Sequence, residues 1–276
     1  MVPITSNTLR VPGGEIAYEV RGSGPMLLMI SGGSGSSSGY AGMADYLARQ
    51  YTVVLYDRLG GPKSPLREAQ ADMSIERHSR DAYLLLIKLG TEPVSVFGSS
   101  AGGLVGLDLL ARYPQQVRLL IAHEPTVPGV LSAFDASQAH QLALYRSKGV
   151  MAALQQSALD TPSAREAPEA DVQLPPPDMQ GALAKAEVMY QHTVPAILSY
   201  QPDFETLTSL SSKLVLAAGQ SSRELATFVY QATEALARRL YIEARTFPGD
   251  HIGCVLHPRA FSSRLLAAVN EFGSNL

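Results

Sequence analysis

The stretch VSVFGSSAGGLVGLDLL, from Val94 to Leu110, passes from a short β-branched and aromatic run into a helical pattern with no connecting loop. Two serines stand between the two patterns, flanked by Gly98 and Gly102. Glycine has no Cβ, so it permits a turn in which the backbone passes very close to neighbouring backbone. The stretch therefore predicts a buried strand, a tight turn and a helix, with Ser100 at the turn.

On both sides of this stretch, short and almost purely apolar runs recur along the chain, at residues 25–30, 51–57, 93–98, 117–123, 213–219 and 241–247. Runs of this kind are typical of strands that are buried on both faces of a parallel sheet. Segments with helical periodicity lie between them, at residues 40–49, 75–89, 101–113, 224–240 and 258–272. The alternation predicts an α/β fold, a mostly parallel twisted sheet with helices on both faces. Gly13 and Gly14 precede an alternating run and predict an N-terminal hairpin.

The alternation stops between residues 125 and 211, where the sequence contains no convincing strand. Helical stretches at residues 138–156 and 180–191 flank a segment rich in proline and small residues, at 160–179. A long insertion of this kind between two strands predicts a helical cap. We therefore expect a core domain formed by residues 1–125 and 212–276, and a cap formed by residues 126–211.

The composition restricts the possible partners. The chain has 276 residues and a formal net charge of −3, so it has no basic excess with which to bind nucleic acid. No apolar stretch is long enough to span a membrane, and the N-terminal segment has no signal-peptide pattern. Cys254 is the single cysteine, which excludes an internal disulfide and a cysteine-based zinc cluster. We expect a cytoplasmic protein without cofactor or metal; its oligomeric state stays open, and a homodimer is compatible with the sequence.

The turn at Ser100 resembles a sequence motif of a known protein family. Gly98, Ser100 and Gly102 form a G-x-S-x-G pattern between a predicted strand and a predicted helix, which is the context of a nucleophile elbow. In this respect the chain resembles the α/β-hydrolases over nearly its whole length, the cap excepted. The resemblance implies that Ser100 is a nucleophile at the carboxyl edge of the sheet.

The same resemblance implies a general base and an acid, in the chain order serine, acid, histidine. His251 follows the last predicted strand, where the family places its histidine. His257 lies close by, but it precedes a proline at a predicted helix start and is interpreted as a surface residue. The other histidines outside the buried strands lie in helical stretches with no motif around them: His78, His140 and His192.

The acid departs from the usual pattern. The turn after the strand at 213–219 has no carboxylate at the expected place. Some family members carry the acid after the preceding strand, and here Glu124 follows the run at 117–123. Glu224 is the alternative acid, although a carboxylate there can simply cap a helix dipole. Asp250 neighbours His251, and adjacent residues rarely orient each other's side chains.

The loop after the first buried strand, Ser-Gly-Gly-Ser-Gly at residues 31–35, resembles the family's oxyanion loop with serines in place of histidine and proline. The resemblance assigns the oxyanion hole to the backbone N–H of Gly33 and of Ala101, with Ser34 as a further candidate. At residues 55–66, Asp57 matches a family turn in which Leu59 stands where arginine is usual. We expect Asp57 to bind backbone.

These features favour a serine hydrolase acting through an acyl-enzyme on an ester, thioester, amide or lactone of a small, fairly apolar molecule. A serine nucleophile argues against the epoxide hydrolase and dehalogenase branches, which need a carboxylate. Alternatives are a non-hydrolytic enzyme on the same scaffold, such as a lyase, cyclase, acyltransferase or cofactor-free oxygenase, and a ligand-binding protein without catalysis. Several cap side chains can line an apolar pocket or pack the cap: Tyr145, Met151, Met179, Met189, Tyr190 and Tyr200. Cys254 is expected to be a buried neighbour of His251.

Overall fold

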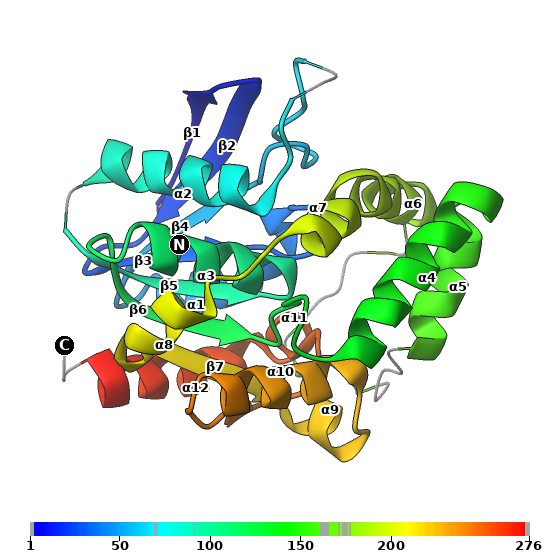
Figure 1. Ribbon diagram of the computed structural model, residues 1–276. Helices are drawn as coiled ribbons and strands as arrows, with labels where there is room; N and C mark the ends of the chain where they lie inside the picture. The colour runs from blue at the N-terminus through cyan, green and yellow to red at the C-terminus, as the bar shows by residue number, and fades with distance from the viewer. Residues whose placement is uncertain are drawn as a thin grey trace.

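The computed structural model describes residues 3–68, 71–90, 92–160, 166–170, 172, 176 and 178–273. Its centre is an eight-stranded sheet in the order β1-β2-β4-β3-β5-β6-β7-β8 (Figure 1). The first two strands form an antiparallel hairpin that pairs antiparallel with β4, and the remaining strands are parallel. The strands are β1 Ile4–Val11, β2 Gly14–Arg21, β3 Met26–Ile30, β4 Thr52–Tyr56, β5 Val94–Ser99, β6 Val117–His123, β7 Leu214–Gly219 and β8 Arg245–Phe247. The predicted fold class is confirmed.

Helices follow most of the parallel strands. The helices are α1 Ala41–Leu47, α2 Ile75–Leu89, α3 Ala101–Arg112, α4 Ser132–Lys148, α5 Val150–Asp160, α6 Met179–Val188, α7 Val194–Ser199, α8 Phe204–Ser209, α9 Gln220–Glu224, α10 Phe228–Arg239, α11 Gly253–Leu256 and α12 Pro258–Gly273. Short 3-10 turns η1 and η3 span Ser37–Tyr40 and Ser211–Lys213, and a π-helical turn η2 spans Met189–Thr193. Within the ranges given above, no helix combines the length and the apolar character needed to cross a membrane.

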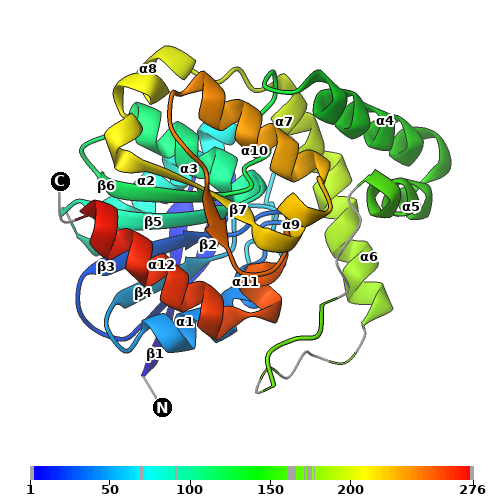
Figure 2. The same ribbon diagram turned by 90° about the horizontal axis from the view of Figure 1, so that it is seen from below.

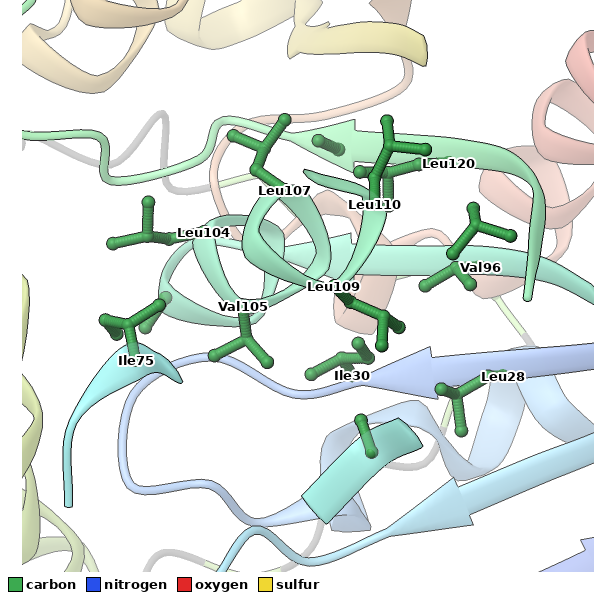
Figure 3. Packing of buried hydrophobic residues seen from close by; sticks show 14 of the residues in the cluster. Leu28, Ile30, Ile75, Val96, Leu104, Val105, Leu107, Leu109, Leu110 and Leu120 are labelled. Carbon is green, nitrogen blue, oxygen red and sulfur yellow. The ribbon is translucent and has the colours of Figure 1, made fainter. Parts of the chain in front are cut away.

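The sheet buries both of its faces because alternate side chains of each strand point to opposite sides. Leu28 and Ile30 pack with α2, α3 and α10 in one hydrophobic cluster, part of which is shown in Figure 3. Leu27 and Met29 pack with α1 and α12 in a second cluster on the other face. Figure 2 shows the two helix layers on either side of the sheet. This two-sided burial accounts for the continuous apolar runs in the sequence.

Helices α4 to α7, which follow β6, extend beyond one end of the sheet, whereas α8 lies back over the core beside α3 (Figures 1 and 2). We call α4 to α7 the cap helices. They enclose a small cluster of their own, built on Leu142, Ala153, Tyr190 and Val194. Met151 and Met179 are exposed. The division into a core and a cap at residues 125 and 211 stays a prediction, and part of the predicted connector at 160–179 lies outside the described residues.

Several element boundaries differ from the prediction. The helix expected at 138–156 is two helices, because Gly149 between them has a left-handed φ of 85°. The helix expected at 224–240 is also divided, with Ala226 left-handed and Thr227 capping α10 through a bond from Tyr230 N. The strand expected at 241–247 is confined to β8, since Tyr241 has a φ of 57° and 87% of it is exposed. Left-handed backbone breaks helices and strands alike.

Glycines at the β5–α3 junction allow a very close approach of three chain segments. A Cβ on Gly98 would collide with the carbonyl oxygen of Gly102. A Cβ on Gly102 would in turn collide with the carbonyl oxygens of Ile30 and Ser31, at the end of β3. The helix α3 can therefore begin directly against the end of β3 only because these two positions have no side chain.

We expect Gly102→Ala to lower the free energy of unfolding by about 1–3 kcal/mol or more, because the added methyl group overpacks fixed backbone. Urea denaturation measures the change. Gly90→Ala is the matched control: Gly90 has extended backbone with a φ of 171°, and its Cβ would meet nothing within 4 Å. There we expect no loss and at most a gain of about 0.4–1 kcal/mol. Equal stability of the two variants would contradict this account of the junction.

Candidate active site

Ser100 occupies the sharp turn between β5 and α3. Its φ is 57°, a left-handed conformation that is uncommon outside glycine, and its N–H donates to the carbonyl of His123 at 2.9 Å. Ser100 is partly exposed, whereas the preceding strand is buried throughout. The turn thus directs one hydroxyl out of the carboxyl edge of the sheet, where open α/β folds bind ligands.

Glu124 and His251 meet beside this turn. Ser99 and His123 are register partners on β5 and β6, so the residues that follow these strands, Ser100 and Glu124, lie at the same sheet edge. Glu124 is fully buried and accepts hydrogen bonds from the backbone N–H of Gly219 at 2.9 Å and from His251 Nδ1 at 2.8 Å. These contacts join the ends of β6 and β7 to the loop after β8.

The carboxylate and the imidazole stabilise each other's charged forms. Burial raises the pKa of Glu124, but the hydrogen bond and charge of His251, together with His123 and the Gly219 N–H, hold it at about 2. Burial lowers the pKa of His251, and the hydrogen bond and charge of Glu124, with a contribution from Asp250, more than reverse this and raise it above 6.5. The His251 ring is therefore held by an ionised partner, which fixes Nδ1 as a donor and leaves Nε2 as the acceptor.

Ser100 and His251 are not hydrogen-bonded to each other. Within the described residues, Ser100 Oγ makes no hydrogen bond, and His251 bonds only through Nδ1. Catalytic hydrogen bonds are often long in a protein without substrate and shorten in its complex. The structure therefore brings Glu124 and His251 into contact and places Ser100 at the adjoining strand end.

The loop at residues 31–35, the candidate oxyanion loop, lies against Ser100. A Cβ on Gly32 would lie 2.8 Å from Ser100 Cβ, so the loop touches the turn, while nothing lies within 4 Å of the corresponding position on Gly33. Gly33 has a φ of 49°. The carbonyl of Gly32 accepts from Gly35 N at 2.9 Å. Because a trans peptide carries its C=O and N–H on opposite sides, this bond turns the N–H of Gly33 away from Gly35.

Ala101 supplies a further backbone donor. It is the first residue of α3, and the first N–H groups of a helix have no intrahelical acceptor. The positive end of the helix dipole lies at the same place. Ala101 adjoins Ser100 in the chain, and Gly33 and Ser34 follow Gly32, which lies against Ser100. The assignment of Gly33, Ser34 and Ala101 to an oxyanion hole stays a prediction.

Arg58 is a site residue that the sequence reasoning missed. Its side chain is buried, and its Nε and Nη2 donate to the carbonyls of Ser31 at 3.1 Å and Gly33 at 2.8 Å. The family pattern placed the arginine at the position of Leu59, which is instead a core residue. The sequence signal for Arg58 was its position just after a predicted buried strand and close to glycines, which allow backbone segments to approach each other closely.

Asp57 binds backbone, as expected. Its Oδ1 accepts from the N–H and hydroxyl of Ser37, at 2.9 and 2.7 Å, and its Oδ2 accepts from Lys63 N at 3.0 Å. Asp57 therefore ties together the loops after β3 and β4. Its carboxylate oxygens are occupied by these structural contacts.

Thr193 is a second residue that was missed. It belongs to the cap helices' π-helical turn, and its hydroxyl donates to the carbonyl of Gly33 at 2.9 Å. The sequence signal was Pro195, because a proline inside a helix removes a backbone donor and disturbs the turn before it.

The remaining candidates lie apart from this constellation. Glu224 is exposed at the end of α9 and accepts from the side chain of Gln220 at 3.1 Å. His257, interpreted from sequence as a surface residue, is instead partly buried and bonds Glu166 Oε2 through Nε2 at 2.5 Å. Burial raises the pKa of the Cys254 thiol to about 12, so this cysteine is not a thiolate nucleophile. Nowhere in the described ranges do three or more acidic, histidine or cysteine side chains gather as metal ligands would.

Comparisons with known proteins agree with this architecture. The model of the alpha/beta hydrolase fold family matches residues 25–223. A protein of Bacillus subtilis (strain 168) named uncharacterized hydrolase YraK is 38% identical over 268 residues, which cover 95% of each chain. A thermophilic esterase from Thermogutta terrifontis superposes with a TM-score of 0.68 at 17% identity, over 98% of this chain and 99% of that one. A hydrolase from Pseudomonas aeruginosa PA01 gives a TM-score of 0.67 at 18% identity, over 95% and 97%. At such low identities these two structures establish the fold alone.

We expect Glu124→Gln to lower the pKa of His251 below its ordinary value of 6.5, because the amide removes the negative charge and leaves the burial. Titration of the His251 ring by NMR measures this shift. Glu224→Gln is the control: it removes a carboxylate that has no contact with His251, and should leave the titration unchanged. If Glu224→Gln lowers the pKa of His251 and Glu124→Gln does not, then Glu224 is the partner of His251 and Glu124 is not.

Proposed function

We propose that this chain, which belongs to the alpha/beta hydrolase fold family and is a hydrolase, uses Ser100 as nucleophile on an ester, thioester, amide or lactone of a small, fairly apolar molecule. The observation that carries the proposal is the 2.8 Å bond between buried Glu124 and His251, at the same sheet edge as the partly exposed Ser100. A buried carboxylate that orients a histidine beside a strained serine is the arrangement that activates a weak hydroxyl nucleophile.

In the first step, Ser100 Oγ forms a bond to the substrate carbonyl carbon while its proton passes to Nε2 of His251. Glu124 stabilises the resulting imidazolium, and its own pKa of about 2 keeps it ionised throughout. The carbonyl oxygen becomes an oxyanion, which the N–H groups of Gly33 and Ala101, with Ser34 as a further donor, would bind. Preorganised donors of this kind contribute most when they are aimed at the developing charge.

In the second step, the bond to the leaving group breaks and that group takes the proton from His251 Nε2, which leaves an acyl ester on Ser100. A water molecule then attacks the acyl carbon and gives a proton to the same nitrogen. Collapse of this second tetrahedral species releases the carboxylic acid and returns the proton to Ser100 Oγ. Apart from the attacking water, the proposed steps use side chains and backbone of this chain.

Two features support an ester-type substrate over other hydrolase chemistries. The nucleophile position holds a serine, whereas opening an epoxide or displacing a halide on this scaffold needs a carboxylate there. Asp57 cannot replace it, because its oxygens are bound to the backbone of Ser37 and Lys63. The small-molecule substrate is the one partner that the proposal requires.

We expect a fluorophosphonate probe to modify the native protein at Ser100, because phosphonylation requires an activated serine. Mass spectrometry of the labelled peptides locates the adduct. Ser100→Ala should abolish labelling, while Ser99→Ala, which changes the adjacent serine bonded to His123, should retain the adduct on Ser100. Absence of an adduct in folded wild-type protein would contradict the proposed function.

We expect Glu124→Gln to lower kcat for p-nitrophenyl butyrate by roughly 10²–10⁴-fold, as loss of the orienting carboxylate does in comparable triads. The pH profile gives an independent reading. Because Glu124 raises the pKa of His251, wild-type kcat/KM should rise with pH through a value above 6.5, as the base becomes neutral. In Glu124→Gln this acid limb should move to lower pH. Glu224→Gln should leave both rate and profile as in wild type; a large loss there would make Glu224 the acid.

A further inference from the structure

The carbonyl oxygen of Gly33 is held from two sides. Arg58 Nη2 donates to it at 2.8 Å from the core, and Thr193 Oγ1 donates to it at 2.9 Å from the cap helices. A carbonyl oxygen has two lone pairs, so both of its acceptor positions are occupied. The second contact joins residues that are 160 positions apart in the chain.

Fixing this oxygen also fixes a donor. In the planar trans peptide between Gly33 and Ser34, the N–H of Ser34 points opposite to the Gly33 carbonyl. Gly33 itself has a left-handed φ of 49°, and glycine can leave such a conformation at little steric cost. The loop that is proposed to bind the oxyanion thus depends on outside contacts for its shape, and Thr193 supplies one of them.

The backbone around Thr193 departs from a regular α-helix and forms a π-helical turn that ends at this residue. Pro195 has no N–H, so it cannot continue the regular i→i−4 bonding of the helix. The N–H of Val194 instead bonds the carbonyl of Met189, which is the i→i−5 pattern of a π-helical turn. Thr193 closes this turn with only 4% of its surface exposed. Such turns are rare and concentrate at functional sites.

We propose that Thr193 is a positioning residue for the oxyanion hole. Its hydroxyl holds the Gly33–Ser34 peptide so that the N–H of Ser34 faces the developing negative charge, beside the N–H groups of Gly33 and Ala101. The hole is therefore complete only when the cap helices are packed on the core. The inference rests on the proposed serine-hydrolase function. Its consequence is specific: loss of the hydroxyl impairs the formation of the tetrahedral intermediate more than it impairs the binding of substrate.

The test compares Thr193→Val, Thr193→Ser and wild type with p-nitrophenyl butyrate. Valine keeps the shape and removes the donor, so we expect kcat to fall about ten-fold with KM within about two-fold, less than the loss of a whole oxyanion donor. Serine restores the donor and should return kcat to within about two-fold of wild type. Thr208→Val is the matched control, because the Thr208 hydroxyl donates to a carbonyl within α8 at 2.7 Å, and it should match wild type.

An inhibitor pair separates positioning from packing. A trifluoromethyl ketone adds to Ser100 as a tetrahedral oxyanion, so its Ki should rise in Thr193→Val in proportion to the fall in kcat. The corresponding secondary alcohol, which cannot form an oxyanion, should keep its Ki. If Thr193→Val does not fold, as judged by circular dichroism, Thr193→Ala tests the same loss of the donor.

Two negative results have different meanings. If wild type labels with fluorophosphonate at Ser100 while the valine variant keeps its kcat and its ketone Ki, the role of Thr193 is overturned and the proposed function stands. A higher KM with unchanged kcat, or equal losses of affinity for both inhibitors, would likewise overturn it, because these results indicate packing of the cap alone. Failure of wild type to label or turn over ester would instead overturn the proposed function.

Discussion

The backbone of Gly102 packs directly against the carbonyl groups of Ile30 and Ser31, with no room for a side chain between them. This contact sets the distance between the start of α3 and the end of β3. Ser100 lies just before α3, and the oxyanion loop lies just after β3, so the same contact brings the nucleophile and its proposed donors together. A residue with a Cβ at this place would separate the two halves of the site even if every other side chain were unchanged.

Much of the fold could be predicted because its signals are local. Continuous apolar runs, helical periodicity and the glycines around Ser100 each lie within a few residues of the structure that they specify. The place of Glu124 at the carboxyl edge of the sheet was predictable because it directly follows a buried strand, whereas its choice as the acid came from the family resemblance and stays a prediction. The strand at 241–247 was predicted too long because nothing in the local pattern indicates the left-handed backbone of Tyr241.

Arg58 and Thr193 were missed because their roles depend on contacts distant in sequence. The family pattern drew attention to Leu59, one residue away from the arginine that in fact binds the oxyanion loop. Thr193 lies in a segment whose only signal is a proline inside a helix, and its partner is 160 residues away. A pairwise contact of this separation leaves no periodicity in the sequence. The roles of such residues can be identified only from the three-dimensional structure.

Two of the buried charges of the site, on Arg58 and Glu124, match the proposed reaction. In the described part of the chain, the side chain of Arg58 makes no ion pair and donates only to the carbonyls of Ser31 and Gly33, so its positive charge lies against the proposed oxyanion loop. Glu124 places a negative charge against His251.

Attack of Ser100 on a carbonyl would create the complementary charges, an oxyanion at the loop and an imidazolium at His251. Burial weakens the solvent screening of these interactions, so fixed charges of the right sign stabilise that pair more than the neutral reactants. The cost of burying Arg58 and Glu124 is borne by the folded state before substrate binds, which is why both charges need the hydrogen bonds that hold them in place. In the proposed arrangement, Thr193 acts from the cap side on the same Gly33 carbonyl that the buried guanidinium of Arg58 holds from the core side.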